Sequence, residues 1–209
     1  MPDTQLSNKA TVFVVDDDQA MRNSLKWLIE SVGVQVESFA SADEFLRQYQ
    51  AGRSGCLVAD VRMPGMSGLD LQDYLVEHRI RIPVVIITGH GDVPMAVRAM
   101  KSGAVDFIEK PFNDEVLLDA IRRAIAFEEQ QRSHESEHHQ IQQRLASLTP
   151  REHEVMDMVT EGKSNKEIAN TLGVSAKTIE AHRARVMEKM QAGSLAELVR
   201  MALSVSNNH

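Results

Sequence analysis

Positive charge, cysteine and long apolar runs are all in short supply in this sequence, and each shortage excludes a class of protein. The single cysteine, Cys56, cannot form a disulfide within the chain, and the apolar residues 57–59 that follow it predict a buried core position. The longest apolar candidate, residues 84–87, is far shorter than the roughly 20 residues of a membrane-spanning helix. Residues 1–9 lack the basic and apolar regions of a signal peptide. We therefore expect a cytoplasmic protein with no membrane segment and no disulfide framework.

The charge is negative overall, but it is unevenly distributed. The formal net charge is −7, which argues against a protein that coats nucleic acid regardless of sequence. From Thr149 onward, eight basic residues balance eight acidic ones, so the whole deficit lies upstream. A neutral C-terminal segment does not exclude DNA binding, although it lacks the basic excess that is typical of a DNA-binding domain. The length of 209 residues suits two domains, each with its own core.

Residues 11–127 alternate short apolar segments with segments of helical spacing. Five segments read as strands, at residues 11–15, 34–39, 55–59, 83–87 and 105–108. Ser41 and Glu44 are spaced as a capping box that opens a helix, and Gly33 and Gly103 fall where helices should end. Five strands that alternate with helices predict an α/β fold, in which a doubly wound five-stranded parallel sheet is covered by helices on both faces.

The remaining residues contain helical patterns only. Residues 128–147 are strongly polar without Gly or Pro and form either a flexible tether or a helix, and the spacing of Ile141, Leu145 and Leu148 favours a helix. Gly173 and Ser175 form a short turn between two predicted helices, which indicates a helix-turn-helix. Two further capping boxes are expected, at Thr149–Glu152 and Ser164–Glu167. The expected divisions are a disordered tail at 1–10, an α/β domain at 11–127, a linker at 128–147 and a small all-α domain at 148–209.

Three consecutive aspartates, Asp16, Asp17 and Asp18, directly follow the first predicted strand. Two such charges about 4 Å apart repel by roughly 4 kcal/mol at an effective dielectric near 20, so a folded site rarely holds them without a cation or a proton. Asp60, Thr88 and Lys110 follow the third, fourth and fifth strands, and the carboxyl ends of parallel strands meet at one sheet edge. These oxygen donors suit Mg²⁺ together with a bound phosphoryl group, which would make Asp60 a nucleophile and its product an acyl phosphate.

Each of these residues also has an ordinary structural interpretation. Asp18 is better explained as a helix N-cap than as a metal ligand. Thr88 alone could be a capping hydroxyl, and Lys110 alone a solvated lysine. Their convergence on one sheet edge is what favours a phosphoryl site.

Four motifs resemble the receiver domain of two-component response regulators over residues 11–127: Val14-Val15-Asp16-Asp17-Asp18, Asp60-Val-Arg-Met-Pro-Gly-Met-Ser-Gly68, Ile87-Thr88-Gly-His90 and Lys110-Pro111-Phe112. The resemblance implies a flavodoxin-like fold and a sensor histidine kinase that phosphorylates Asp60, with Lys110 and Thr88 as catalytic partners. It implies Mg²⁺ as cofactor, with Mn²⁺ as a substitute, and the implied ligands are Asp16, Asp17, Asp60 and the main-chain carbonyl of Arg62. Thr88 and Phe107 would form a switch pair, and the bond before Pro111 would be cis.

The C-terminal pattern resembles the helix-turn-helix of the LuxR and NarL type over residues 148–205, and the whole chain is similar to FixJ-type regulators. In the predicted helix at 176–190, Ile179, Val186 and Met190 form a stripe to be buried, while small alanines on the other side allow close approach to base edges. By resemblance, the residues expected at double-stranded promoter DNA are Asn165, Lys166, Lys177, Thr178, Glu180, Ala181, Arg183, Ala184 and Arg185. Phosphorylation in this family often creates a homodimer through the fourth helix and fifth strand, for which the candidates are Met95, Val97, Arg98, Met100 and Val105.

The sequence therefore predicts a phosphorylation-activated transcriptional regulator, whose only catalysis is the uptake and loss of its own phosphoryl group. Two alternatives come from other classes. One is a Mg²⁺-dependent aspartyl phosphohydrolase, which would turn over small phosphate esters repeatedly. The other is a phospho-switched interaction protein, whose C-terminal helices would bind proteins instead of DNA.

Overall fold

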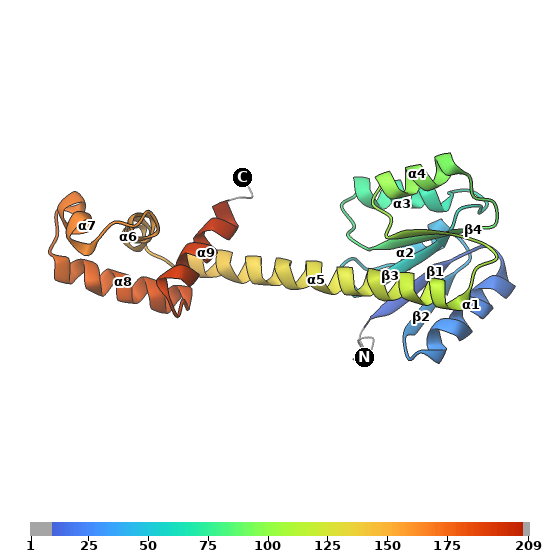
Figure 1. The fold of residues 1–209 in the computed structure, drawn as a ribbon, viewed down its shortest axis with the longest axis horizontal. Coiled ribbons are helices and arrows are strands. Elements are labelled where there is room, and N and C mark those ends of the chain that lie inside the picture. Colours follow the sequence, from blue (N-terminus) through green and yellow to red (C-terminus); the bar gives the residue numbers. More distant parts are fainter. Residues whose placement is uncertain (1–9, 207–209) are drawn as a thin grey trace. The chain divides into compact units, whose positions relative to one another are not determined.

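The structure is a computed structural model and describes residues 10–206 (Figure 1). The chain divides into two compact units, with the boundary between Gln131 and Arg132. Residues 1–9 of the expected disordered tail lie outside the described residues. Ala10, which the sequence analysis assigned to that tail, is buried in the core of the first unit.

The first unit is built on a parallel sheet of five strands in the order β2-β1-β3-β4-β5. The strands are β1 (Thr11–Val15), β2 (Gln35–Phe39), β3 (Gly55–Asp60), β4 (Val84–Thr88) and β5 (Asp106–Glu109). The helices between and after them are α1 (Gln19–Ser31), α2 (Ala42–Gln48), α3 (Gly68–Glu77), α4 (Val93–Lys101) and α5 (Asp114–Ala146). Because successive side chains of a strand point to opposite faces, Val12 and Val14 pack on one side of the sheet and Phe13 and Val15 on the other.

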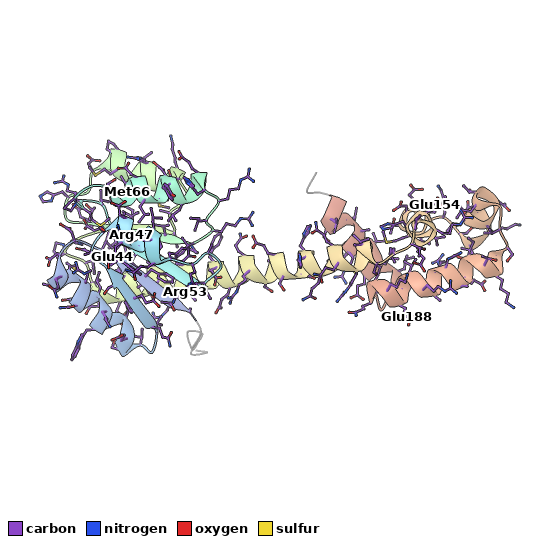
Figure 2. The ribbon with its side chains drawn as sticks, turned by 180° about the vertical axis from the view of Figure 1, so that it is seen from behind. Glu44, Arg47, Arg53, Met66, Glu154 and Glu188 are labelled. Atoms are coloured by element: carbon purple, nitrogen blue, oxygen red, sulfur yellow. The ribbon has the colours of Figure 1, made fainter. Side chains whose placement is uncertain are left out.

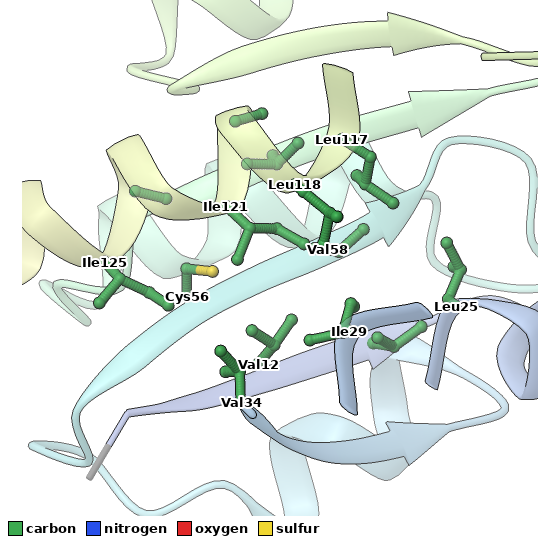
Figure 3. Close-up of a cluster of buried hydrophobic side chains, with 14 of the residues drawn as sticks. Val12, Leu25, Ile29, Val34, Cys56, Val58, Leu117, Leu118, Ile121 and Ile125 are labelled. Atoms are coloured by element: carbon green, nitrogen blue, oxygen red, sulfur yellow. The ribbon is translucent and has the colours of Figure 1, made fainter. Parts of the chain in front are cut away.

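Helices cover both faces of this sheet, which confirms the predicted doubly wound α/β fold. Leu25 and Ile29 of α1 and Ile121 of α5 share one apolar cluster with Val12 and Cys56 of the strands (Figure 3). Side chains of α2, α3 and α4 pack in a second cluster on the opposite face. Cys56 is fully buried, and burial, aided by the nearby Glu128 carboxylate, raises the pKa of its thiol to about 12. It is therefore a core residue, as predicted.

Local differences from the predicted elements are small and have local causes. β2, β4 and β5 each begin one residue later than predicted, at Gln35, Val84 and Asp106. The box predicted at the start of α2 is only half formed: the Ser41 hydroxyl accepts from the Glu44 N–H, but the Glu44 carboxylate accepts from the Ala40 N–H, one residue before the N-cap. The N-cap prediction was therefore correct and the reciprocal bond was wrong.

The second unit is helical, with α6 (Pro150–Thr160), α7 (Asn165–Leu172), α8 (Ala176–Met190) and α9 (Leu195–Ser206). Both predicted capping boxes are present, at the starts of α6 and α7. Gly173 takes the left-handed conformation at φ 67° that ends α7, and Ser175 caps α8, so the predicted turn between two helices is confirmed. Ile179, Val186 and Met190 form the buried stripe of α8, as predicted.

Helix α5 continues without a break through residues 128–146, which is all but the last residue of the linker predicted at 128–147. Ile141 and Leu148 are buried in the apolar cluster of the second unit, and Leu145 packs against it. The guanidinium of Arg144 donates to the Met190 carbonyl at the end of α8. The core of the second unit therefore includes side chains upstream of residue 148.

Between residues 10 and 206, no helix is both long enough and apolar enough to cross a membrane.

Candidate functional site

Two acidic side chains and one lysine converge at the carboxyl edge of the sheet. Asp60 ends β3, Asp16 follows β1, and Lys110 follows β5. The Lys110 ammonium donates to Asp60 Oδ1 at 2.7 Å and to Asp16 Oδ2 at 2.8 Å. Only 5% of Asp60 and 1% of Asp16 is exposed. Asp16 lies 94 positions before Lys110 in the sequence, and Asp60 lies 50 positions before it. The three side chains meet because the parallel strands end at the same edge.

The three consecutive aspartates have three different roles. Asp16 is buried and accepts a second hydrogen bond through Oδ1, from the Asp18 N–H at 2.9 Å. Asp18 is the N-cap of α1 and accepts from the Ala20 N–H at 2.8 Å, as predicted. Asp17 lies between them with an exposed side chain. The repulsion expected within the triplet is therefore relieved by a lysine, by backbone N–H groups and by solvent.

The protonation of the site follows from burial and from the shared ammonium. Burial raises the pKa of Asp60 above its ordinary value, although the Lys110 ammonium and the Arg62 N–H act against it. Burial acts to lower the pKa of Lys110, but the hydrogen bonds to Asp16 and Asp60 outweigh it and raise the pKa. Lys110 therefore remains a cation at neutral pH, beside a carboxylate whose charge is destabilised by burial. Such a carboxylate favours a further cation or an electrophile nearby.

The donors at this edge fit a hard divalent cation in chemistry. The carboxylates of Asp16 and Asp60 both lie within hydrogen-bond distance of one nitrogen, and oxygen donors of this kind suit Mg²⁺. Asp17 follows Asp16 directly and has an exposed carboxylate, and residues 10–206 hold no group of three or more Asp, Glu, His or Cys side chains already arranged as a metal site.

The two residues of the predicted switch pair lie on neighbouring strands. Thr88, the last residue of β4, is fully buried, and its Oγ1 accepts from the His90 N–H at 3.3 Å. Phe107 is half-buried in β5, opposite Ile86 in the ladder. A Cβ added to Gly91 would lie 3.0 Å from the Phe107 ring and 3.3 Å from Thr88 Cγ2, so Gly91 lies over both side chains. The bond between Lys110 and Pro111 is cis, as the resemblance implied.

The predicted dimer surface on α4 and β5 is only partly exposed. Val97 and Met100 are exposed, at 45% and 50%, whereas Met95 and Val105 are half-buried and pack against the two apolar clusters. Arg98 is exposed but engaged: its Nη2 lies 2.7 Å from Asp70 Oδ1 and 2.6 Å from Asp73 Oδ2, both on α3. These two acids, three residues apart on the face of α3 toward α4, were not identified from the sequence.

Two further residues near the acidic edge were missed by sequence reasoning. The Arg22 guanidinium donates from Nη1 to the main-chain carbonyls of Asp16 at 2.7 Å and Asp17 at 2.9 Å. Gly68, the first residue of α3, lies so close to β3 that an added Cβ would be 2.2 Å from the Asp60 carbonyl oxygen. The only available signals were an arginine shortly after the acidic triplet and a glycine shortly after Asp60.

Most residues expected at DNA have exposed side chains on α7 and α8. The exposed members are Lys166, Lys177, Thr178, Glu180, Ala181, Ala184 and Arg185. Glu188 of α8, labelled in Figure 2, is also exposed. Asn165 and Arg183 are half-buried, and the Arg183 guanidinium donates to Asn165 Oδ1 at 2.7 Å. This pair joins α7 to α8, so both residues have a structural partner in addition to their expected place at DNA.

An ion pair between the buried Glu152 of α6 and the half-buried Lys189 of α8 joins these two helices. The Lys189 ammonium donates to Glu152 Oε2 at 2.6 Å and to the Ser147 carbonyl at 3.1 Å. Glu152 is also the reciprocal residue of the capping box at Thr149, and only 3% of it is exposed. The hydrogen bonds from Lys189 and from the Thr149 N–H lower the pKa of Glu152 to about 2. The sequence predicted the cap but not its link to α8.

Comparisons with known proteins agree with this geometry. A family model of the response regulator receiver domain matches residues 12–122, and one of the luxR family of bacterial regulatory proteins matches residues 146–202. Nodulation protein W of Bradyrhizobium diazoefficiens is 48% identical over 208 residues, covering 99% of this chain and 92% of that protein. The transcriptional regulatory protein FixJ of the same organism is also 48% identical, covering 95% of this chain and 97% of that one.

A solved structure extends the agreement to the fold. The low-resolution structure of the response regulator StyR matches with a TM-score of 0.86 at 45% identity, covering 93% of this chain and 98% of that chain. Both family models and near-full-length relatives thus point to a phosphorylation-dependent transcription regulator and not to an enzyme of metabolism. The chain belongs to the two-component response regulators of the FixJ type, in which a receiver domain precedes a LuxR-type helix-turn-helix domain.

Proposed function

We propose that a sensor histidine kinase transfers a phosphoryl group to Asp60 and that the phosphorylated chain then dimerises and binds promoter DNA. The observation that carries the proposal is the Lys110 ammonium held between the two nearly buried carboxylates of Asp16 and Asp60. It brings together an anionic nucleophile and a cation that can receive a phosphoryl oxygen, at the end of the sheet where ligands of such folds bind.

The reaction is a displacement at phosphorus. A carboxylate oxygen of Asp60 forms a bond to the phosphorus of a phosphohistidine while the nitrogen–phosphorus bond breaks, and the imidazole leaves with that electron pair. Lys110 stabilises charge on one phosphoryl oxygen, and the Thr88 hydroxyl donates to another. When Mg²⁺ or Mn²⁺ is bound, it neutralises the phosphoryl oxygens and the carboxylates that surround them. The residues that would hold it are Asp16, Asp17, Asp60 and the Arg62 main-chain carbonyl.

The new dianion also acts as a switch. It attracts the Thr88 hydroxyl, which then gives up its 3.3 Å contact with the His90 N–H. Phe107 moves into the vacated space, because its ring already lies beside Gly91 and Thr88. The change reaches the surface of α4 and β5, where Met95, Val97, Arg98 and Val105 contribute to a homodimer. Two linked DNA-binding units then gain from effective concentration on adjacent half-sites.

DNA is read by α8 in the major groove. Lys166 and Lys177 contact phosphates, together with Asn165, while Glu180, Ala181 and Ala184 lie at base edges. Thr178, Arg183 and Arg185 lie beside them. The two alanines support this assignment, because an exposed face with small side chains lets the helix backbone approach the bases closely.

The decisive experiment is phosphorylation of the full-length protein and of Asp60→Asn by a small phosphodonor, with intact mass as the readout. We expect one added phosphoryl group on the unaltered chain and none on Asp60→Asn, because an amide cannot form the acyl phosphate. Asp119→Asn, which removes an exposed carboxylate paired with Arg122, is the matched control. A phosphoryl group retained by Asp60→Asn would rule out Asp60 as the acceptor.

A further inference from the structure

Arg22 stands in a position that is unfavourable for a cation unless it has a local partner. It lies in the first turn of α1, where the helix dipole presents partial positive charge, and that turn contains no acidic residue. Among residues 10–206, its guanidinium forms no ion pair with a side chain. It turns back toward the end of β1, where a single nitrogen, Nη1, donates to two successive carbonyls, those of Asp16 and Asp17.

The loop that Arg22 holds is the one that presents the acidic triplet. Within this loop, the Asp18 N–H binds Asp16 Oδ1, and the Asp18 carboxylate binds the first N–H groups of α1. These bonds fix the loop on its N–H side, and Arg22 fixes it on its carbonyl side. The peptide group between Asp17 and Asp18 is therefore held at both its N–H and its carbonyl, and the one between Asp16 and Asp17 is held at its carbonyl, which limits the direction in which the exposed Asp17 carboxylate leaves the backbone.

We propose that Arg22 is a positioning residue for the divalent cation at this edge, which it serves by orienting the main chain of Asp16 and Asp17. The inference rests on the proposed function, in which these aspartates hold Mg²⁺. A purely electrostatic role for Arg22 has the opposite consequence: a nearby positive charge weakens cation binding, so its removal alone would tighten it. The sign of the change in Mg²⁺ affinity therefore separates the two roles.

The test is a calorimetric titration of the full-length protein with MgCl₂ at neutral pH. Arg22→Met keeps the apolar stem of the side chain and removes the donors, and we expect its association constant for Mg²⁺ to fall at least tenfold, about 1.4 kcal/mol. Arg22→Lys should recover part of this loss, because an ammonium can reach one of the two carbonyls. Arg122→Met, which removes an arginine paired with Asp119 on its own helix, should bind Mg²⁺ like the unaltered chain.

Two further readouts distinguish positioning from general damage. The thermal midpoint of Arg22→Met should remain within a few degrees of the unaltered protein, and phosphorylation by acetyl phosphate should return to the normal rate at saturating MgCl₂. If Arg22→Met does not fold, Arg22→Gln replaces it with the same expected loss.

Unchanged or tighter Mg²⁺ binding by the folded variant would overturn the role of Arg22 and leave the proposed function intact. Absence of Mg²⁺ binding by the unaltered chain would overturn the proposed cation site itself, and the role of Arg22 with it.

Discussion

Lys110 in the first unit and Lys177 in the second are both expected to meet phosphate groups, but their surroundings are opposite. Lys110 has a side chain that is 18% exposed and contacts two carboxylates at 2.7 and 2.8 Å. Lys177 is exposed in the first turn of α8, and no hydrogen bond or ion pair of it is found in the described part of the chain. The Lys110 ammonium is oriented before a phosphoryl group binds, which favours catalysis of phosphoryl transfer. The Lys177 ammonium is free to exchange salt ions for DNA phosphates, as suits reversible binding.

The largest effect should come from removing the Lys110 ammonium, which Asp16 and Asp60 orient. Lys110→Ala leaves two nearly buried carboxylates without their cation and removes the group that receives a phosphoryl oxygen. We expect the rate of phosphorylation by acetyl phosphate to fall about 100-fold, a loss typical of one electrostatic donor. Intact mass over time measures this rate, with Lys26→Ala as control because Lys26 is exposed and paired with Glu30 on its own helix. A rate within a factor of two of normal would show that Lys110 does not act on the phosphoryl group.

An intermediate effect should come from removing the exposed ammonium of Lys177. Lys177→Ala should weaken DNA binding about tenfold, about 1.4 kcal/mol, and by the same factor for different sequences. The slope of log K against log salt should become shallower by about 0.9, the value for one released counterion. Fluorescence anisotropy with two unrelated duplexes at several salt concentrations measures both. A loss confined to one duplex would instead assign Lys177 to base recognition.

The smallest effect should come from removing the ion pair between Glu152 of α6 and Lys189 of α8. Because Glu152 has a pKa of about 2 in the folded chain and an ordinary value of 4.5, its charge stabilises the second unit above pH 4.5. This contribution is lost as the pH falls from 4.5 toward 2. Glu152→Gln should therefore reduce the protection of α6 and α8 amides from hydrogen exchange at pH 6, and differ progressively less from the unaltered chain below pH 4.5.

Glu154→Gln is the matched control for this experiment, since Glu154 (Figure 2) is exposed and paired with Arg151 on its own helix. The idea fails if the two variants show the same protection at pH 6. That result would mean that the ion pair between Glu152 and Lys189 does not stabilise the second unit, in contrast to the expected importance of the ion pairs of Lys110 in the first unit.

The sequence predicted best those features that depend on local rules or on strand order. The convergence of Asp16, Asp60 and Lys110 was predicted because parallel strands end at one edge, so position along the chain is enough to bring them together. The caps at Thr149 and Ser164 were found because N-cap and third-residue types are local.

The features that were missed involve long side chains and their choice of partner. Arg22 could have paired with any carboxylate of the triplet, yet it binds carbonyls. Arg98 was expected on a dimer surface, but it contacts α3 because Asp70 and Asp73 are presented toward it. Periodicity predicts which face of a helix a residue occupies, whereas the partner depends on which neighbouring helix the fold brings into reach.

The buried thiol of Cys56 has a practical consequence for studies of motion in this chain. With a pKa of about 12, it is almost entirely protonated at neutral pH, and its burial keeps alkylating reagents away from the sulfur. Because the sequence has no other cysteine, a fluorophore or spin label can be attached to a cysteine introduced on α4 or α8 with the native residue left in place. Distances between such labels, with and without phosphodonor, can then report on the protein with its native core intact.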